Sequence, residues 1–203
     1  MKEITVSKDV WSTMVYLYFG ATDNYYKAAS ARAYLDFCRT IKFTAPSNEE
    51  ERARARTDVD GMIENKFKAI ADASITSQDE YDEWHKELCE EIVGRYAKIC
   101  GDQFCIGQAQ KWVNMTVKYL YLIDGGCVKS ITPFAHVPLD NYVFTAAREH
   151  LALSSDSLTP WSKIKDYSVY LNYQTGLRKA VKALNADPLC WEMLYWLEEA
   201  KKH

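Results

Sequence analysis

The sequence predicts an all-α protein: a single compact domain of about eight to ten helices. Apolar residues recur at helical spacing along most of the chain, and no segment shows the alternating pattern of a strand. Short joints containing Gly, Pro or capping residues separate the periodic segments. With 203 residues, of which 48% are hydrophobic, the chain can bury one core around several helices. No internal repeat or Gly/Ser linker divides it, so residues 1–203 are predicted to form one domain.

The first part of the chain is predicted to hold two helices and the start of a third. The first covers about residues 8–20, and the second covers about residues 23–42. Pro46 then breaks the chain, and Ser47 followed by Glu50 forms a capping-box pattern before a long charged helix. The apolar stripe expected for the second helix includes Ala28, Tyr34, Leu35 and Cys38.

Two strongly patterned helices are predicted next. Ser77 and Glu80 form a second capping box, and Gly101 is expected to end the helix that it opens. The following helix starts near Gly107 and is expected to lie at the centre of the core, ending at Gly125-Gly126. The apolar residues of the two helices, at helical spacing, are Tyr81, Trp84, Leu88, Ile92 and Tyr96, and then Trp112, Val113, Val117, Leu120 and Tyr121.

Proline-containing segments mark three later helix starts. The Pro138-Leu139-Asp140 segment is predicted to open a helix that runs to about Glu149. Thr159-Pro160 and Asp187-Pro188 each place a capping residue before a proline, which suits the first position of a helix. These signals complete an arrangement without strands.

Composition limits the classes of function. The net charge of −3 argues against binding nucleic acid through overall charge, so a nucleic-acid surface would consist of a few well-placed cations in the second half. No apolar run is long enough to span a bilayer and the first residues lack a signal-peptide pattern, so a cytoplasmic location is expected. The six scattered cysteines are expected to be reduced, and neither a metal nor another cofactor is predicted.

Residues 101–150 carry the most informative pattern. A turn at Ile106-Gly107 precedes a helix bearing Lys111, and the next loop ends at the Pro138-Leu139-Asp140 segment. This order resembles the helix-hairpin-helix DNA glycosylases, and the pattern is most similar to that of the archaeal 8-oxoguanine DNA glycosylases. The chain departs from that family in lacking a Leu-Pro-Gly-Val-Gly hairpin and a carboxyl-terminal four-cysteine cluster. Asn141-Tyr142 also replaces the usual Thr-His or Ser-Arg pair.

The resemblance implies a site for removing a damaged or modified base from duplex DNA. A carboxylate beside C1′ stabilises a developing oxocarbenium ion, and a lysine can attack C1′ to form a Schiff base. Asp140 and Lys111 are the expected catalytic residues, with Lys118 as a rival nucleophile two helical turns on. The expected DNA-binding residues are Gly107, Lys118, Lys163 and Lys165, and the expected base pocket consists of Trp112, Trp161 and His136. Trp191 and Trp196 are further candidates for stacking on an extruded base.

Each of these residues also has a purely structural interpretation. Asp140 is a good helix cap, Lys111 suits a solvated position on an amphipathic helix, and tryptophans are more often core residues. If all of these residues have structural roles alone, the protein is a non-catalytic helical interaction module. A helical nuclease toxin is a weaker alternative, because Arg148 and His150 are too close for its Arg-x4-6-His motif. The glycosylase hypothesis predicts that Asp140 and a lysine converge on one cleft rimmed by cations. We expect such an enzyme to act as a monomer.

Overall fold

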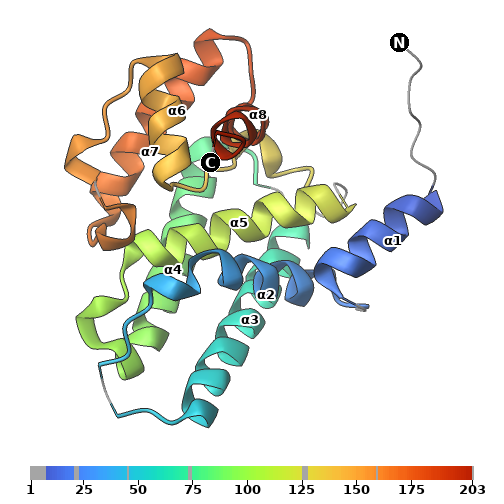
Figure 1. Cartoon of the computed structure of the whole chain (residues 1–203), viewed down its shortest axis with the longest axis vertical. Coiled ribbons are helices and arrows are strands. Elements are labelled where there is room, and N and C mark those ends of the chain that lie inside the picture. Colours follow the sequence, from blue (N-terminus) through green and yellow to red (C-terminus); the bar gives the residue numbers. More distant parts are fainter. Residues whose placement is uncertain are drawn as a thin grey trace.

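The residues that the structure describes form eight α-helices and five short 3-10 helices (Figure 1). The structure, a computed structural model, describes residues 8–20, 23–44, 46–72, 75–124, 128–158 and 160–202. Within these ranges there is no strand, and the all-α prediction is confirmed. The α-helices are α1 (Lys8–Phe19), α2 (Tyr25–Phe37), α3 (Glu49–Asp72), α4 (Gln78–Cys100), α5 (Ile106–Asp124), α6 (Asn141–Leu151), α7 (Tyr167–Ala183) and α8 (Pro188–Ala200). The 3-10 helices are η1 (Cys38–Thr40), η2 (Gly101–Gln103), η3 (Thr132–Phe134), η4 (Asp156–Leu158) and η5 (Trp161–Lys163).

Helix α5 is the central helix, as the sequence predicts. Every residue from 104 to 120 is buried, which includes the first fifteen residues of α5. The helix contacts α2, α4, α7 and η5, and Figure 1 shows it crossing the middle of the molecule beside α2. Helices α6, α7 and α8 lie together on one side of it, whereas α2 and α3 lie on the other. Residues on α5 can therefore meet residues from both halves of the chain.

The caps of α3 and α4 show where local signals succeed and fail. Ser77 and Glu80 form the predicted capping box of α4. For α3 the predicted box is wrong by one residue, because Asn48 accepts from the Glu51 N–H at 2.9 Å and Glu51 accepts from the Asn48 N–H at 3.0 Å. Ser47 instead accepts a hydrogen bond from Arg52 Nε at 3.1 Å. Both spacings fit a capping box, and the structure has the one that begins at Asn48.

The second helix is shorter than predicted, and its buried face differs. Asn24 caps α2 by accepting from the Lys27 N–H, and η1 follows the last residue of the helix. Leu35, expected in the apolar stripe, is 55% exposed. The side of α2 that packs against α5 consists mainly of small residues, which allow the two helices to approach closely. The buried residues of α2 are Ala28, Ala29, Ser30, Ala33 and Phe37.

The proline signals have different outcomes. Pro188 is the first residue of α8, as predicted. Pro160 precedes only the single turn of η5, and α7 begins later, with Asp166 accepting from the Ser168 N–H at 2.7 Å. The prediction of an α-helix at Thr159-Pro160 is therefore wrong for the described part. Thr159, like Gly125, Gly126 and Cys127, lies outside the described residues.

In the described ranges the cysteines are free thiols. No helix in these ranges is both long and apolar enough to cross a membrane.

Candidate active site

Asp140 caps α6 and also faces a neighbouring helix. Its Oδ1 accepts a hydrogen bond from the Val143 N–H at 2.9 Å, which confirms that the Pro138-Leu139-Asp140 segment opens this helix. The other carboxylate oxygen, Oδ2, accepts from Lys111 Nζ at 2.6 Å and from Trp196 Nε1 at 3.1 Å. The carboxylate is thus held by α5, α6 and α8 together. Capping and a place in a site are compatible roles for this residue.

Two hollows meet at the ion pair between Lys111 and Asp140. They measure about 340 Å³ and about 480 Å³, and we call them together the cleft. The larger extends toward Arg32, Lys118 and Trp196, and the smaller extends toward Trp161 and Glu199. The side chains of Lys111 and Asp140 are only 5% and 14% exposed, so the pair lies at the base of the cleft. The residues that line both hollows are Asp36, Arg39, Lys111, Asp140 and Tyr142.

A second buried ion pair forms part of the wall of the cleft. Lys118 Nζ lies 2.9 Å from Glu192 Oε1 and 4.9 Å from the centre of the Trp196 ring. Burial raises the pKa of Glu192, and the positive charge of Lys118 opposes this change. Trp196 therefore connects the two pairs, because its N–H donates to Asp140 and its ring faces Lys118. Lys118, expected to bind DNA, is largely buried and neutralised inside the protein.

Two buried glutamines fix the segment that ends at Asp140. Gln110 donates to the Leu139 carbonyl at 3.1 Å and accepts from the Leu139 N–H at 3.1 Å. Gln174 donates to the Val137 carbonyl at 2.6 Å and accepts from the Val137 N–H at 3.1 Å. Each side-chain amide satisfies both polar groups of one backbone residue, as a neighbouring strand would. The segment before Asp140 is therefore held rigidly without secondary structure of its own.

His136 lies in a buried polar network and does not line the cleft. Its Nδ1 is 2.9 Å from the Tyr170 hydroxyl, and its Nε2 is 2.8 Å from Asp82 Oδ1. Burial lowers the pKa of His136, although the carboxylate of Asp82 opposes this change. Burial raises the pKa of Asp82, but hydrogen bonds from His136, Gln78 and Arg178 outweigh it and bring that pKa to about 2. The network reaches the segment that ends at Asp140 through Asn114, which donates to Tyr170 and to Gln110.

Two of the expected DNA contacts are engaged inside the protein. Trp112 is fully buried, and its Nε1 donates to the Ser30 carbonyl at 3.1 Å, so it is a core residue and not part of a base pocket. The Gly107 N–H donates to the Ile164 carbonyl at 2.9 Å, and a Cβ at this glycine would lie 2.0 Å from the Trp161 carbonyl oxygen. This N–H is therefore not available to a phosphate in the structure.

Lys163 and Lys165 lie on the surface away from the cleft lining. Lys165 Nζ forms an ion pair with Asp102 at 3.0 Å, and Lys163 Nζ lies 3.4 Å from Gln103 Oε1. Of the residues predicted for the site, the structure brings together Asp140, Lys111, Lys118 and Trp161, and it adds Trp196, one of the stacking candidates. Sequence reasoning missed Arg39, which lies in no motif and reaches the cleft through packing. It noted Tyr142 only as a departure from the family pattern and did not assign it to the site.

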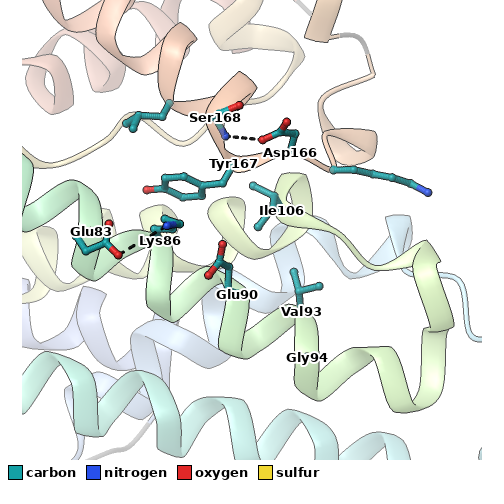
Figure 2. Close-up of a pocket in the computed structure, with 11 residues that line it drawn as sticks. Glu83, Lys86, Glu90, Val93, Gly94, Ile106, Asp166, Tyr167 and Ser168 are labelled. Atoms are coloured by element: carbon teal, nitrogen blue, oxygen red, sulfur yellow. Dashed lines mark hydrogen bonds and ion pairs between the residues drawn. The ribbon is translucent and has the colours of Figure 1, made fainter.

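A larger hollow between α4 and the start of α7 lacks comparable chemistry. It measures about 900 Å³, and Figure 2 shows the Tyr167 ring between the two helices. Several of its charged groups are already engaged: Lys86 pairs with Glu83 on the same helix at 3.7 Å, Asp166 caps α7, and Lys165 pairs with Asp102 at 3.0 Å. Among the described residues that line this hollow, no buried lysine pairs with a carboxylate. The cleft is the stronger candidate for a reaction centre.

One group of side chains has the composition of a metal site. Ligand atoms of Glu149, His150 and Glu199 lie within 4.8 Å of one another, and this is the single such group among the described residues. Lys202 Nζ, however, binds Glu199 and lies 3.4 Å from Glu149 Oε2. The ammonium group thus provides the positive charge that a cation would supply, and the geometry gives no independent reason to place a metal there.

The fold and the cleft define a helical protein with a paired lysine and aspartate at the base of a cleft with several cations. Comparisons with protein-family models, curated proteins and solved structures found no match. The case for a function therefore depends on the chemistry of the cleft itself.

Proposed function

We propose that the protein is a DNA glycosylase that removes a damaged or modified base, in repair or antiviral defence. The observation that carries this proposal is the contact of 2.6 Å between Lys111 Nζ and Asp140 Oδ2 in the cleft. Arg32, Arg39 and Lys118 also line this cleft. A non-catalytic interaction module does not require a lysine and a carboxylate to converge in this way.

The pair supplies the two groups that the reaction needs. Asp140 relays a proton from the Lys111 ammonium group to water and is ionised again, and the neutral amine attacks C1′ of the extruded nucleotide. The bond between C1′ and the base nitrogen breaks, and the base leaves with the electron pair and takes a proton from water. The ionised form of Asp140 stabilises positive charge on the sugar as that bond lengthens. The attached nitrogen then loses a proton, and its electron pair forms the C=N bond as the bond between C1′ and O4′ breaks and O4′ takes a proton. The product is a protonated Schiff base, from which the strand can be cleaved.

The aromatic groups of the cleft suit an extruded base. Trp196 and Tyr142 line its larger hollow, and their rings pack edge to face with centres 5.7 Å apart. Trp161, predicted for the base pocket, lines the smaller hollow. Flipped bases are commonly held by aromatic stacking and by polar contacts to their edges. In this proposal these side chains replace Trp112 and His136 as the base pocket.

The segment α4–η2–α5 is the counterpart of a divergent helix-hairpin-helix in this proposal. It joins two long helices through one 3-10 turn and places Lys111 in the second turn of α5. Because the Gly107 N–H is engaged with Ile164, phosphate contacts come from side chains rather than from this turn. A monomer that acts on duplex DNA in the cytoplasm is part of the same proposal.

The test is to incubate the protein with duplexes that carry a panel of oxidised, alkylated and hypermodified bases. Released bases and alkali-labile sites are then measured. The wild type is expected to release at least one base, and Asp140→Asn is expected to lower that rate by at least ~100-fold. Asparagine caps helices as well as aspartate does, and circular dichroism of the variant checks that the fold is retained. Release at an equal rate by Asp140→Asn contradicts the mechanism.

Borohydride trapping tests the lysine separately. A covalent adduct with the wild type that is absent from Lys111→Ala and present in Lys118→Ala assigns the nucleophile to Lys111. An adduct that survives in Lys111→Ala moves the assignment to another amine. If base release occurs without any adduct, water is the nucleophile and Asp140 activates it.

A further inference from the structure

The cleft contains four cations, and three of them are already neutralised by carboxylates. Lys111 pairs with Asp140, and Lys118 pairs with Glu192. The third, Arg32, lies 3.5 Å from an Asp36 carboxylate oxygen, and its guanidinium stacks on a tyrosine ring at 4.5 Å. Only the fourth cation has no carboxylate partner among the described residues and can bind an anionic ligand.

Arg39 is that remaining cation. It belongs to η1 at the end of α2, it is exposed, and it lines both hollows of the cleft. Within the ranges that the structure describes, its guanidinium makes neither an ion pair nor a hydrogen bond. The nearest acid in sequence, Asp36, is occupied, because it pairs with Arg32 and accepts from the Tyr119 hydroxyl at 2.7 Å. Arg39 is thus free to bind an anion that enters beside Lys111 and Asp140.

The surroundings of Arg39 favour a nucleic-acid strand over a small free anion. Leu35 lies one helical turn before it, is 55% exposed, and lines the larger hollow together with Leu122, which is 39% exposed. In a nucleic-acid strand, charged phosphates alternate with less polar sugars and bases. A cation can bind the phosphate of such a strand while neighbouring apolar side chains contact its sugars and bases. A guanidinium group can bind one phosphate through two parallel hydrogen bonds.

We infer that Arg39 binds a backbone phosphodiester of the strand whose sugar lies at Lys111 and Asp140. This inference rests on the proposed glycosylase function and deepens it. Each sugar in a strand has a phosphate on either side, so a strand with C1′ at the ion pair places a phosphate elsewhere along the same cleft. Arg39, at the junction of both hollows, then takes the role that the sequence suggested for Gly107, Lys163 and Lys165.

The experiment measures binding of a fluorescent duplex that contains a tetrahydrofuran abasic-site analogue. This probe needs no knowledge of the base. Fluorescence anisotropy is recorded at several KCl concentrations for the wild type, Arg39→Ala, Arg39→Lys and Arg54→Ala. Arg54 is an exposed arginine on α3 that lines a different hollow, so its loss is a matched change in charge.

Arg39→Ala is expected to raise Kd by about tenfold and to lower the slope of log Kd against log salt by about one. Arg39→Lys is expected to keep the slope and to recover part of the affinity, because the charge remains while the forked geometry is lost. Arg54→Ala is expected to match the wild type.

Each other outcome has a defined meaning. Wild-type binding with equal Kd and slope for Arg39→Ala and Arg54→Ala overturns the role of Arg39 and leaves the glycosylase proposal standing. A wild type that does not bind the probe overturns both. Circular dichroism of each variant checks that a loss of binding is not a loss of fold.

Discussion

Gln110 and Leu139 exchange two hydrogen bonds of 3.1 Å each between the central helix and the segment before α6. The next residue on each side is a member of the ion pair, so Lys111 faces Asp140 as Gln110 faces Leu139. The backbone contact therefore sets the register in which the two charged groups meet. Gln110 also donates to the Gly107 carbonyl at 3.0 Å, which fixes its own side chain.

Replacing Gln110 by glutamate is expected to damage both stability and activity. The carboxylate cannot donate to the Leu139 carbonyl, so a buried acceptor is left without a partner beside a negative charge. We expect a loss of about 2 kcal/mol in the free energy of unfolding, measured by urea denaturation. We also expect the single-turnover rate of base release to fall by at least ~10-fold, because Asp140 is no longer held against Lys111.

Gln174→Glu is the matched control for this prediction. Gln174 binds Val137 in the same way as Gln110 binds Leu139. Val137, however, is two residues further from Asp140 along the segment than Leu139. It should destabilise the protein to a similar extent with a smaller effect on the rate. Equal effects of the two substitutions on the rate would indicate a general loss of structure and not a positioning role for Gln110.

The helix boundaries that the sequence predicts well are those set by local hydrogen bonds. Ser77 with Glu80, Asp140 before α6 and Pro188 at the start of α8 need only their own turn of helix to act. Where two local solutions fit, as for Ser47 and Asn48, the sequence does not decide between them. Asp140 and Lys111 could be predicted to lie close together because they follow, in order along the chain, a glycine turn, a helix and a Pro-Leu-Asp segment that resemble a known family pattern.

The rest of the cleft depends on tertiary packing. Trp112 and Trp196 are both aromatic residues on amphipathic helices, yet one is bonded to Ser30 in the core and the other to Asp140. The choice follows from how α8 packs against α6, which no spacing within α8 specifies. His136 is likewise placed by Asp82, a partner 54 residues away in the chain. Such long-range partners are absent from local patterns.

The buried pair of Lys118 and Glu192 leads to a prediction about stability. Lys118→Met leaves a buried carboxylate without its cation, and we expect a loss of about 3 kcal/mol in the free energy of unfolding at pH 8. The loss should be smaller at pH 5, because burial already raises the pKa of Glu192 and the carboxyl group can then take up a proton. The double variant Lys118→Met/Glu192→Leu should recover most of the loss. A loss that is equal at both pH values, with no recovery in the double variant, contradicts this account.

The neutral state of two buried histidines predicts a loss of stability in mild acid. Burial lowers the pKa of His85 and of His136 below the ordinary value of 6.5. The unfolded chain therefore binds protons below about pH 6.5 that the folded chain does not, and stability falls as the pH decreases through this range. Each histidine should lower the free energy of unfolding by up to ~1.4 kcal/mol between pH 7.5 and 5.5.

Denaturation in urea at the two pH values measures this effect. His136→Gln should show a smaller difference between pH 7.5 and 5.5 than the wild type, whatever its absolute stability. A wild type that is equally stable at both pH values would show that the two buried histidines are not held neutral.

The close approach of Gly107 to the backbone of η5 predicts opposite effects for two glycine substitutions. In Gly107→Ala the new Cβ would lie 2.0 Å from the Trp161 carbonyl oxygen, so the backbone after Pro160 must move and the hydrogen bond from the Gly107 N–H to Ile164 is strained. We expect a loss of about 3 kcal/mol or more in the free energy of unfolding. Gly94→Ala meets nothing within 4 Å in the middle of α4, so it should stabilise the protein by about 0.5–1 kcal/mol. Urea denaturation of both variants measures the contrast, and equal stability of the two would mean that η5 does not pack against the start of α5 as the structure shows.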